Sequence, residues 1–218
     1  GDVQERLPMA GGHLLFFGLQ LNSIEEADME RALAGSAALA HYRPWLTDLR
    51  LDKPYQLDDK LEQLFLEKSA TGAGAFNRLF DETMSALRFD VKGEELAIEP
   101  TLNLLLDKDG AMRKAASDAL AKTFGDNIRL FTLITNTLAK DKQIGDTWRG
   151  FEDVADARHL ANRVERPVVD ALVAAVEDAV PRISHRYYAM KAKWMGMEQL
   201  NHWDRNAPLP IASTRNIK

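Results

Sequence analysis

The sequence contains no cysteine, and this absence excludes disulfide bonds from its fold. A chain without cysteine and without a secretory leader pattern is typical of a cytoplasmic protein. Apolar runs are short as well, because a run such as Leu14–Phe17 falls far below the roughly 20 residues of a membrane-spanning helix. The sequence therefore predicts a cytoplasmic protein with no membrane partner.

Positive charge is scarce relative to negative charge. The 218 residues include 28 Lys and Arg against 33 Asp and Glu, which gives a formal net charge of −5 at pH 7. This balance provides no electrostatic attraction to nucleic acid or anionic lipid, so we expect no nucleic-acid partner. With 45% hydrophobic residues, the chain can bury a substantial core in one domain or two small ones.

The histidines are too scattered for a helical zinc motif. A His-Glu-x-x-His motif places two imidazoles on successive turns of one helix, where both reach one zinc ion. Asp156 lies three residues before His159 and close to Glu152–Asp153, but a polar pair or helix cap explains this group more simply than a metal site. We expect no catalytic residue, metal ligand or cofactor in this chain. No two of its histidines lie four apart: His13, His41, His159, His185 and His202.

The spacing of apolar residues predicts an all-α body. Apolar residues recur at the intervals of amphipathic helices, as Leu57 and Leu61 do. Asn22–Ser23 is either a break between two helices or a polar patch on one long helix. Asp109 is placed to cap a helix that ends at Gly125. The predicted helices cover residues 13–24, 25–39, 57–68, 75–87, 109–125 and 126–140.

One segment departs from the helical spacing. Phe89 and Val91 alternate with charged residues, Lys92–Gly93 supplies a turn, and alternation resumes with Leu96 and Ile98. This period of two predicts one short β-hairpin at about residues 87–98. An isolated hairpin is marginally stable in water, so we expect it to lie on the helices.

The last third of the chain carries a long apolar stripe. Pro167 suits the first position of a helix, where its missing N–H costs nothing. Because Pro181 interrupts the pattern, we predict either one long helix kinked near Pro181 or two helices that meet there. The members of the stripe are Val169, Leu172, Val173, Val176, Val180, Ile183, Tyr187, Met190, Trp194 and Met197.

The run Ser69–Gly74 separates two of the predicted helices. It lacks the Gly-Lys-Ser/Thr ending of a phosphate-binding loop, and no strand precedes it. We therefore interpret it as a helix–helix connection.

Several short motifs follow one another between Ser69 and Pro210. They are Ser69–Gly72, Phe76–Glu82, Asp141–Ile144, Trp148–Phe151, Ala157–Asn162, Pro167–Leu172, His185–Tyr188, Lys191–Lys193, Trp203–Arg205 and Ala207–Pro210. Their order and spacing resemble the oligoendopeptidase F family of thimet-type zinc metallopeptidases, and the resemblance covers roughly two thirds of the chain.

The resemblance implies a mostly helical body with a deep channel, in which zinc lies on the opposite wall. In the family, the zinc ligands and catalytic Glu follow the region similar to Ala207–Pro210, so zinc is expected in the complete enzyme and not in this segment. The complete enzyme is expected to act on oligopeptides, while this chain forms one wall of the channel and is inactive alone. The candidates for that wall are Arg158, His159, Asn162, Tyr187 and Tyr188, and for each a buried or capping role is the alternative.

The resemblance also predicts how the chain is divided. Residues 1–206 are expected to form the helical N-terminal and middle part of an oligoendopeptidase-like fold, and residues 207–218 a linker or a truncated entry to the catalytic lobe. The alternative is an expressed domain with frayed ends. If that lobe normally covers the stripe after Pro181, the isolated chain should self-associate through its C-terminal helix.

A different class of protein is the alternative. The segment Asp109–Leu120 resembles one helix of an α-solenoid repeat, which would make the chain a helical-repeat scaffold that binds proteins. Solenoids stack several units at a fixed period, because one unit cannot bury its own apolar face. Only one such unit is recognisable in the sequence, so the peptidase-like interpretation is preferred.

Overall fold

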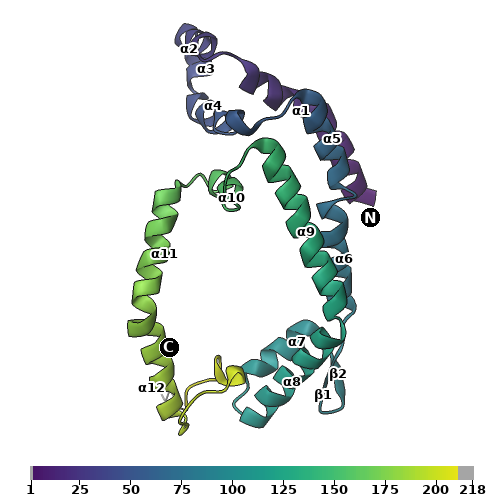
Figure 1. Ribbon diagram of the computed structural model, residues 1–218, viewed down its shortest axis with the longest axis vertical. Coiled ribbons are helices and arrows are strands. Elements are labelled where there is room, and N and C mark those ends of the chain that lie inside the picture. Colours follow the sequence, from purple (N-terminus) through teal and green to yellow (C-terminus); the bar gives the residue numbers. More distant parts are fainter. Residues whose placement is uncertain (1, 211–218) are drawn as a thin grey trace. The chain divides into compact units, whose positions relative to one another are not determined.

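The computed structural model describes residues 2–210, and the predicted class is confirmed there: an all-α body with one short β-hairpin (Figure 1). The chain divides into two compact units, Gly1–Arg78 with Ile134–Arg166 and Leu79–Leu133 with Pro167–Lys218. Of the segment 207–218 that the sequence predicts as a linker, residues 211–218 lie outside the described residues. Among residues 2–210, none of the helices combines the length and apolar content that a bilayer-crossing segment requires.

The first unit is built from helices and short helical turns. Two long helices, α6 and α9, contribute residues to both units. The elements are α1 (Asp2–Ser23), α2 (Glu26–Gly35), α3 (Ala37–Ala40), α4 (Arg43–Arg50), the 3-10 turn Lys53–Tyr55, α5 (Asp59–Ser69), α6 (Ala73–Ala86), α9 (Ile128–Arg149) and α10 (Asp156–Ala161).

The sequence left open whether Asn22–Ser23 is a break between two helices or a polar patch on one helix. The structure shows a break, since α1 ends at Ser23 and α2 begins at Glu26. The guanidinium of Arg50 donates to the carbonyl oxygens of Leu21 and Ile24 at 3.1 and 2.9 Å, and Lys53 Nζ donates to the Ile24 carbonyl at 3.2 Å. These donors satisfy carbonyls that the end of a helix leaves without partners. Leu21 also packs against the small core cluster that α2 and α4 form with Met29, Leu33 and Leu46.

The predicted helix 25–39 is wrong in its extent. Helix α2 ends at Gly35, because Ser36 adopts an extended conformation and accepts a hydrogen bond from the Leu39 N–H as the cap of α3. A serine hydroxyl at such a position competes with helix continuation. The predicted helix 57–68 is confirmed as α5, which begins after the cap Asp58, and Ser69–Gly74 joins α5 to α6 as expected.

The second unit contains the hairpin and the helices that support it. Helix α9 is longer than the predicted 126–140, since it continues to Arg149. The elements are β1 (Phe89–Val91), β2 (Glu94–Leu96), α7 (Ile98–Asn103), the 3-10 turn Leu104–Leu106, α8 (Gly110–Asp126), α11 (Arg166–Val180), a π-helical turn (Pro181–His185), α12 (Arg186–Trp194) and the 3-10 turn His202–Asp204.

The hairpin lies on α8, as predicted. Lys92 and Gly93 both have positive φ, 55° and 90°, which the tight turn between β1 and β2 requires. The side chain of Phe89 is fully buried and forms a core cluster with Val91 and with Ala119 of α8. Because one face of the hairpin is covered in this way, the two strands are stable despite their length.

The predicted interruption at Pro181 takes the form of a π-helical turn. Helical backbone runs from α11 through Pro181–His185 into α12 without a break, so the first of the two predicted alternatives holds. Helix α12 ends at Trp194, and Gly196 follows with φ of 71°. Met197, a predicted member of the apolar stripe, therefore lies beyond the helix.

Candidate functional site

Three of the five candidate residues lie on or just after α10 in the first unit. Arg158 and Asn162 are exposed, and His159 is half-buried. The Nδ1 atom of His159 is buried and has no hydrogen-bond partner among the described residues. These three residues are neighbours in one short helix, and Asn162 is its C-cap.

The acidic residue near His159 has other partners. Asp156 accepts hydrogen bonds from the Asp153 N–H at 2.8 Å and from Arg166 at 2.5 Å. The hydrogen bond from the Asp153 N–H is the main cause that lowers the pKa of Asp156 below its usual range, and the bond from Arg166 lowers it further. Asp156 therefore pairs with the Asp153 backbone and with Arg166.

The other two candidates, Tyr187 and Tyr188, lie on α12 in the second unit. Their rings meet edge to face, with centroids 5.3 Å apart and an interplanar angle of 64°. The Tyr188 hydroxyl accepts a hydrogen bond from Arg205 Nε at 3.3 Å. A pocket of 410 Å³ opens beside Tyr188 and is lined also by Gln199, Asn201 and Arg205.

A buried ion pair between Arg113 and Asp204 fixes the segment that carries Asn201 and Arg205, two residues of the pocket lining. Arg113 of α8 donates from Nη2 and Nε to Asp204 Oδ1, at 2.7 and 3.1 Å, and the two side chains are 5% and 2% exposed. The second oxygen of Asp204 accepts from the backbone and side-chain nitrogens of Asn201 at 3.2 and 3.0 Å. Both carboxylate oxygens are therefore satisfied, as a buried charge requires.

The pKa of Asp204 reflects this arrangement. Burial alone would raise it, but the hydrogen bonds from Arg113 and Asn201 outweigh burial and lower the pKa below its usual range. Lys191 is also buried, at 2% exposure, and its Nζ donates to the Arg205 carbonyl at 2.7 Å. Burial lowers the pKa of Lys191. The segment that carries Asn201 and Arg205 is thereby fixed against α8 and α12.

A second ion pair stabilises the first unit. Arg149, at the end of α9, donates from both terminal nitrogens to the two oxygens of Glu62 on α5, at 2.7 and 2.8 Å. It also donates to the Tyr55 carbonyl at 3.1 Å, and the Tyr55 ring stacks on Phe151 with centroids 4.1 Å apart. Burial opposes ionisation of Glu62, but the bonds from Arg149 and the Leu57 N–H outweigh it and lower its pKa.

The sequence analysis missed these ion pairs, although one of them left a signal. Arg113 shares a helix face with Ala116 and Leu120, three and seven residues later, so a charge lies within the apolar face of α8. A charge in that place indicates a buried partner. Arg149 gives no comparable signal, because it is the last residue of α9, where a basic side chain is favoured by the helix dipole.

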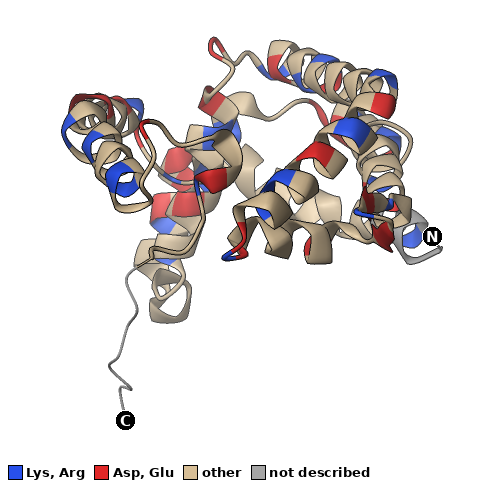
Figure 2. Ribbon diagram, turned by 90° about the horizontal axis from the view of Figure 1, so that it is seen from below, with Lys and Arg blue, Asp and Glu red and all other residues tan. Residues whose placement is uncertain are grey.

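The described residues do not fit a zinc site. Among the side chains that the structure describes, which exclude those of residues 2–5, 7–9 and 211–218, no group of three His, Asp or Glu is arranged to hold a metal ion. Elsewhere on the ribbon, basic and acidic residues are interspersed along the same helices (Figure 2). The absence of a nucleic-acid partner stays a prediction.

Comparisons with known proteins confirm the resemblance that the sequence motifs indicated. The family model described as oligopeptidase F matches residues 20–89. The chain is 25% identical over 198 residues to oligopeptidase PepF of Bacillus subtilis (strain 168), and 22% identical over 200 residues to group B oligopeptidase PepB of Streptococcus agalactiae serotype III (strain NEM316). The chain is thus similar to oligoendopeptidase F peptidases.

The fold is also found in a solved structure. The crystal structure of oligoendopeptidase-F from Enterococcus faecium superposes with a TM-score of 0.76 at 19% identity, over 89% of this chain and 39% of that chain. The matches to the two curated relatives take in 87% and 89% of this chain but only 29% and 33% of the relatives' lengths. The chain therefore spans about a third of the proteins that it resembles.

Removal of the Asp204 charge should destabilise the second unit in a pH-dependent way. We expect Asp204→Asn to lower the free energy of unfolding by about 3–5 kcal/mol at pH 7, because Arg113 stays buried without its counter-ion. Since the folded pKa of Asp204 lies below the unfolded value of about 3.9, this stabilisation is present above that pH and is lost as the pH falls through the folded pKa. Denaturant unfolding at pH 7 and at pH 3 measures both effects.

Asp126→Asn is the matched control for this substitution. Asp126 forms an ion pair with Lys122 across one helical turn, at 2.8 Å, but its side chain is 64% exposed. An exposed pair of this kind contributes at most about 1 kcal/mol. Equal stability losses from the two variants would contradict the role assigned to the buried pair.

Proposed function

We propose that this chain is the non-catalytic portion of a zinc metallo-oligoendopeptidase that hydrolyses short peptides. The observation that carries the proposal is the extent of the match, because the alignment to PepF takes in 87% of this chain and only 29% of the relative. The zinc ligands and the catalytic Glu are assigned to the remainder of the complete enzyme. A cytoplasmic location, expected from the sequence, is part of the same proposal.

The proposed contribution of this chain is one wall of the peptide channel. The pocket beside Tyr188 supports this role, since its lining combines the phenol, the Arg205 guanidinium and the Asn201 amide. Such groups can donate hydrogen bonds to the backbone carbonyls or the carboxylate of a peptide. Arg158, His159 and Asn162 remain the candidates on α10.

The chain on its own is expected to hydrolyse no peptide and to hold no stoichiometric zinc. A catalytic zinc site needs three protein ligands around the ion, and such a group is lacking among the described side chains. Metal analysis after dialysis and a fluorogenic-peptide assay test this expectation. Zinc near one equivalent that disappears in a His159→Ala variant would show that the chain carries a site of its own.

In the complete enzyme, Tyr188→Phe should alter kcat/KM while leaving the melting temperature nearly unchanged. The phenyl ring keeps the packing against Tyr187, and only the hydroxyl that faces Arg205 and the pocket is lost. Loss of one hydrogen bond to bound peptide predicts a decrease of about tenfold. Tyr42→Phe, at an exposed tyrosine of the first unit, is the control. A large loss of stability with unchanged kinetics would make Tyr188 a structural residue.

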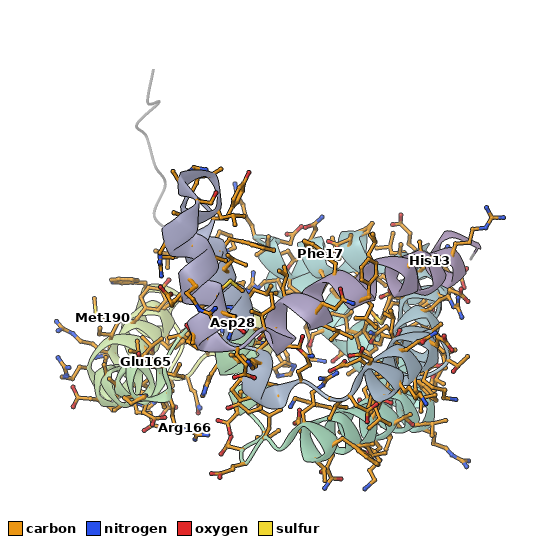
Figure 3. The ribbon with its side chains drawn as sticks, turned by 90° about the horizontal axis from the view of Figure 1, so that it is seen from above. His13, Phe17, Asp28, Glu165, Arg166 and Met190 are labelled. Atoms are coloured by element: carbon orange, nitrogen blue, oxygen red, sulfur yellow. The ribbon has the colours of Figure 1, made fainter. Side chains whose placement is uncertain are left out.

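The stripe on α11 and α12 supports the proposed self-association with a second copy of the chain. Leu172, Val176 and Ile183 are 63%, 52% and 64% exposed, and Met190 on α12 is exposed as well (Figure 3). Burial of each large apolar side chain contributes roughly 1.5–3 kcal/mol. Because two identical stripes can cover each other about a twofold axis, a dimer removes this surface from water.

Sedimentation of the purified chain over a range of concentrations tests the dimer. We expect a concentration-dependent dimer that Leu172→Glu converts to monomer, because a charge within the paired stripe would be buried without a partner. Glu177→Gln, at an exposed residue of the same helix outside the stripe, should leave association unchanged. A wild-type chain that stays monomeric throughout would overturn the proposal.

A further inference from the structure

Arg205 brings unused hydrogen-bond donors to the pocket beside Tyr188. Its Nε–H donates to the Tyr188 hydroxyl at 3.3 Å, whereas its two terminal nitrogens have no hydrogen bond or ion pair to any described residue. Arg205 is exposed and lines the pocket, so these donors are open to a ligand. All residues of the pocket belong to the second unit.

The backbone that carries Arg205 is held on two sides. Asp204, the residue before it, accepts from Arg113 of α8 at 2.7 Å, and Lys191 of α12 donates to the Arg205 carbonyl oxygen at 2.7 Å. The Tyr188 hydroxyl then restrains the Arg205 side chain itself. A donor that is positioned before its ligand arrives loses less conformational entropy on binding.

Positive charge prevails around this pocket. Lys191 lies within electrostatic range of Arg113 and Asp204, so two buried basic side chains share one buried carboxylate. Arg205 adds a third basic group, at the pocket itself. The opposing charge in the lining is Glu198, which is exposed and forms no ion pair with a described residue. Three basic groups against two carboxylates favour an anionic ligand.

The shape of a guanidinium favours a carboxylate among anions. Its nitrogens can donate two parallel hydrogen bonds to the two oxygens of one carboxylate. Arg149 binds Glu62 in this way, at 2.7 and 2.8 Å. Ala189, Ala192 and Leu200 give the pocket an apolar border. This combination suits a carboxylate attached to an apolar group, as at the C-terminus of a peptide.

We infer that Arg205 binds the free C-terminal carboxylate of a peptide in this pocket. This recognition rests on the proposed role of the chain in a peptide channel, and it names the part of the substrate that the pocket contacts. The terminal nitrogens of Arg205 donate to the carboxylate, while the last side chain of the peptide packs on Leu200 and the alanines. An interior segment of a longer chain has no such carboxylate, so the site favours short peptides.

NMR titration of the full 218-residue chain with N-acetylleucine, which has a free carboxylate, tests the inference. N-acetylleucinamide is the neutral probe with the same side chain, and the α-amide of N-acetylaspartic acid carries its carboxylate on the side chain instead. We expect saturable binding of N-acetylleucine with a shift of the Arg205 Nε–H resonance. Both other probes should bind more weakly by about tenfold or more, because hydrogen bonds to a charged acceptor are the stronger ones and the aspartic acid derivative lacks the apolar group.

Arg205→Gln should weaken the binding of N-acetylleucine by about tenfold or more and leave that of the neutral probe unchanged. Arg205→Lys, which keeps the charge but not the paired donors, should weaken it by about threefold or more and provides the test if Arg205→Gln fails to fold. Glu198→Gln removes a like charge and should bind N-acetylleucine at least as tightly as the wild type. Arg182→Gln is the matched control, because Arg182 is exposed, pairs with Asp178 and lies outside the pocket lining.

Equal affinity for N-acetylleucine and its amide, equal affinity for the aspartic acid derivative, or unchanged binding in both Arg205 variants would each overturn the inference. In the complete enzyme, kcat/KM should be about tenfold higher for a peptide with a free C-terminus than for its C-terminal amide. An enzyme that cleaves both forms equally contradicts carboxylate recognition but not the peptidase function. One that cleaves neither contradicts the peptidase function, and N-acetylleucine binding to this chain then decides the carboxylate site.

Discussion

The buried ion pair between Arg113 and Asp204 is the interaction on which the second unit depends most. Removing two ions from water costs several kcal/mol for each, and only good geometry with further hydrogen bonds offsets that cost. The contacts of Arg113 and Asn201 supply this geometry, with both side chains of the ion pair almost fully buried. Since Arg205 follows directly, the position of the Tyr188 pocket is a consequence of where Asp204 is held.

The first unit uses the same chemistry at a different place. Glu62 and Arg149 lie far apart in sequence, and their paired hydrogen bonds tie the end of α9 to α5. An arginine suits this task because its planar guanidinium matches a carboxylate with two parallel bonds and still has a donor for the Tyr55 carbonyl. In the first unit the charge pair thus joins two helices, whereas in the second unit it fixes the 3-10 turn His202–Asp204 to α8.

Local patterns predicted the local features of the fold. The alternation around Lys92–Gly93 identified the hairpin, and Asp109 does cap α8, by accepting from the Ala111 N–H. The end of α2 at Gly35 was missed although Ser36 caps α3 locally, through the Leu39 N–H. The ion pairs were missed because Asp204 and Glu62 lie far from Arg113 and Arg149 in the sequence. For the candidate site, the sequence selected Tyr188, which borders a pocket in the structure, and its place in a peptide channel stays a prediction. The pocket itself depends on Asn201 and Arg205, which come together with Tyr188 only through the tertiary fold.

The π-helical turn at Pro181–His185 changes which side of the helix faces outward. A π turn accommodates one more residue than an α turn, and one residue corresponds to about 100° of rotation in an α-helix. Side chains after the turn are therefore rotated relative to those before it. On α12 Lys191 and Ala192 are buried, whereas α11 has no buried residue among those described. A partner that covers the exposed side chains of α11 must therefore follow a twist in the surface of this one continuous helix to reach Met190 on α12.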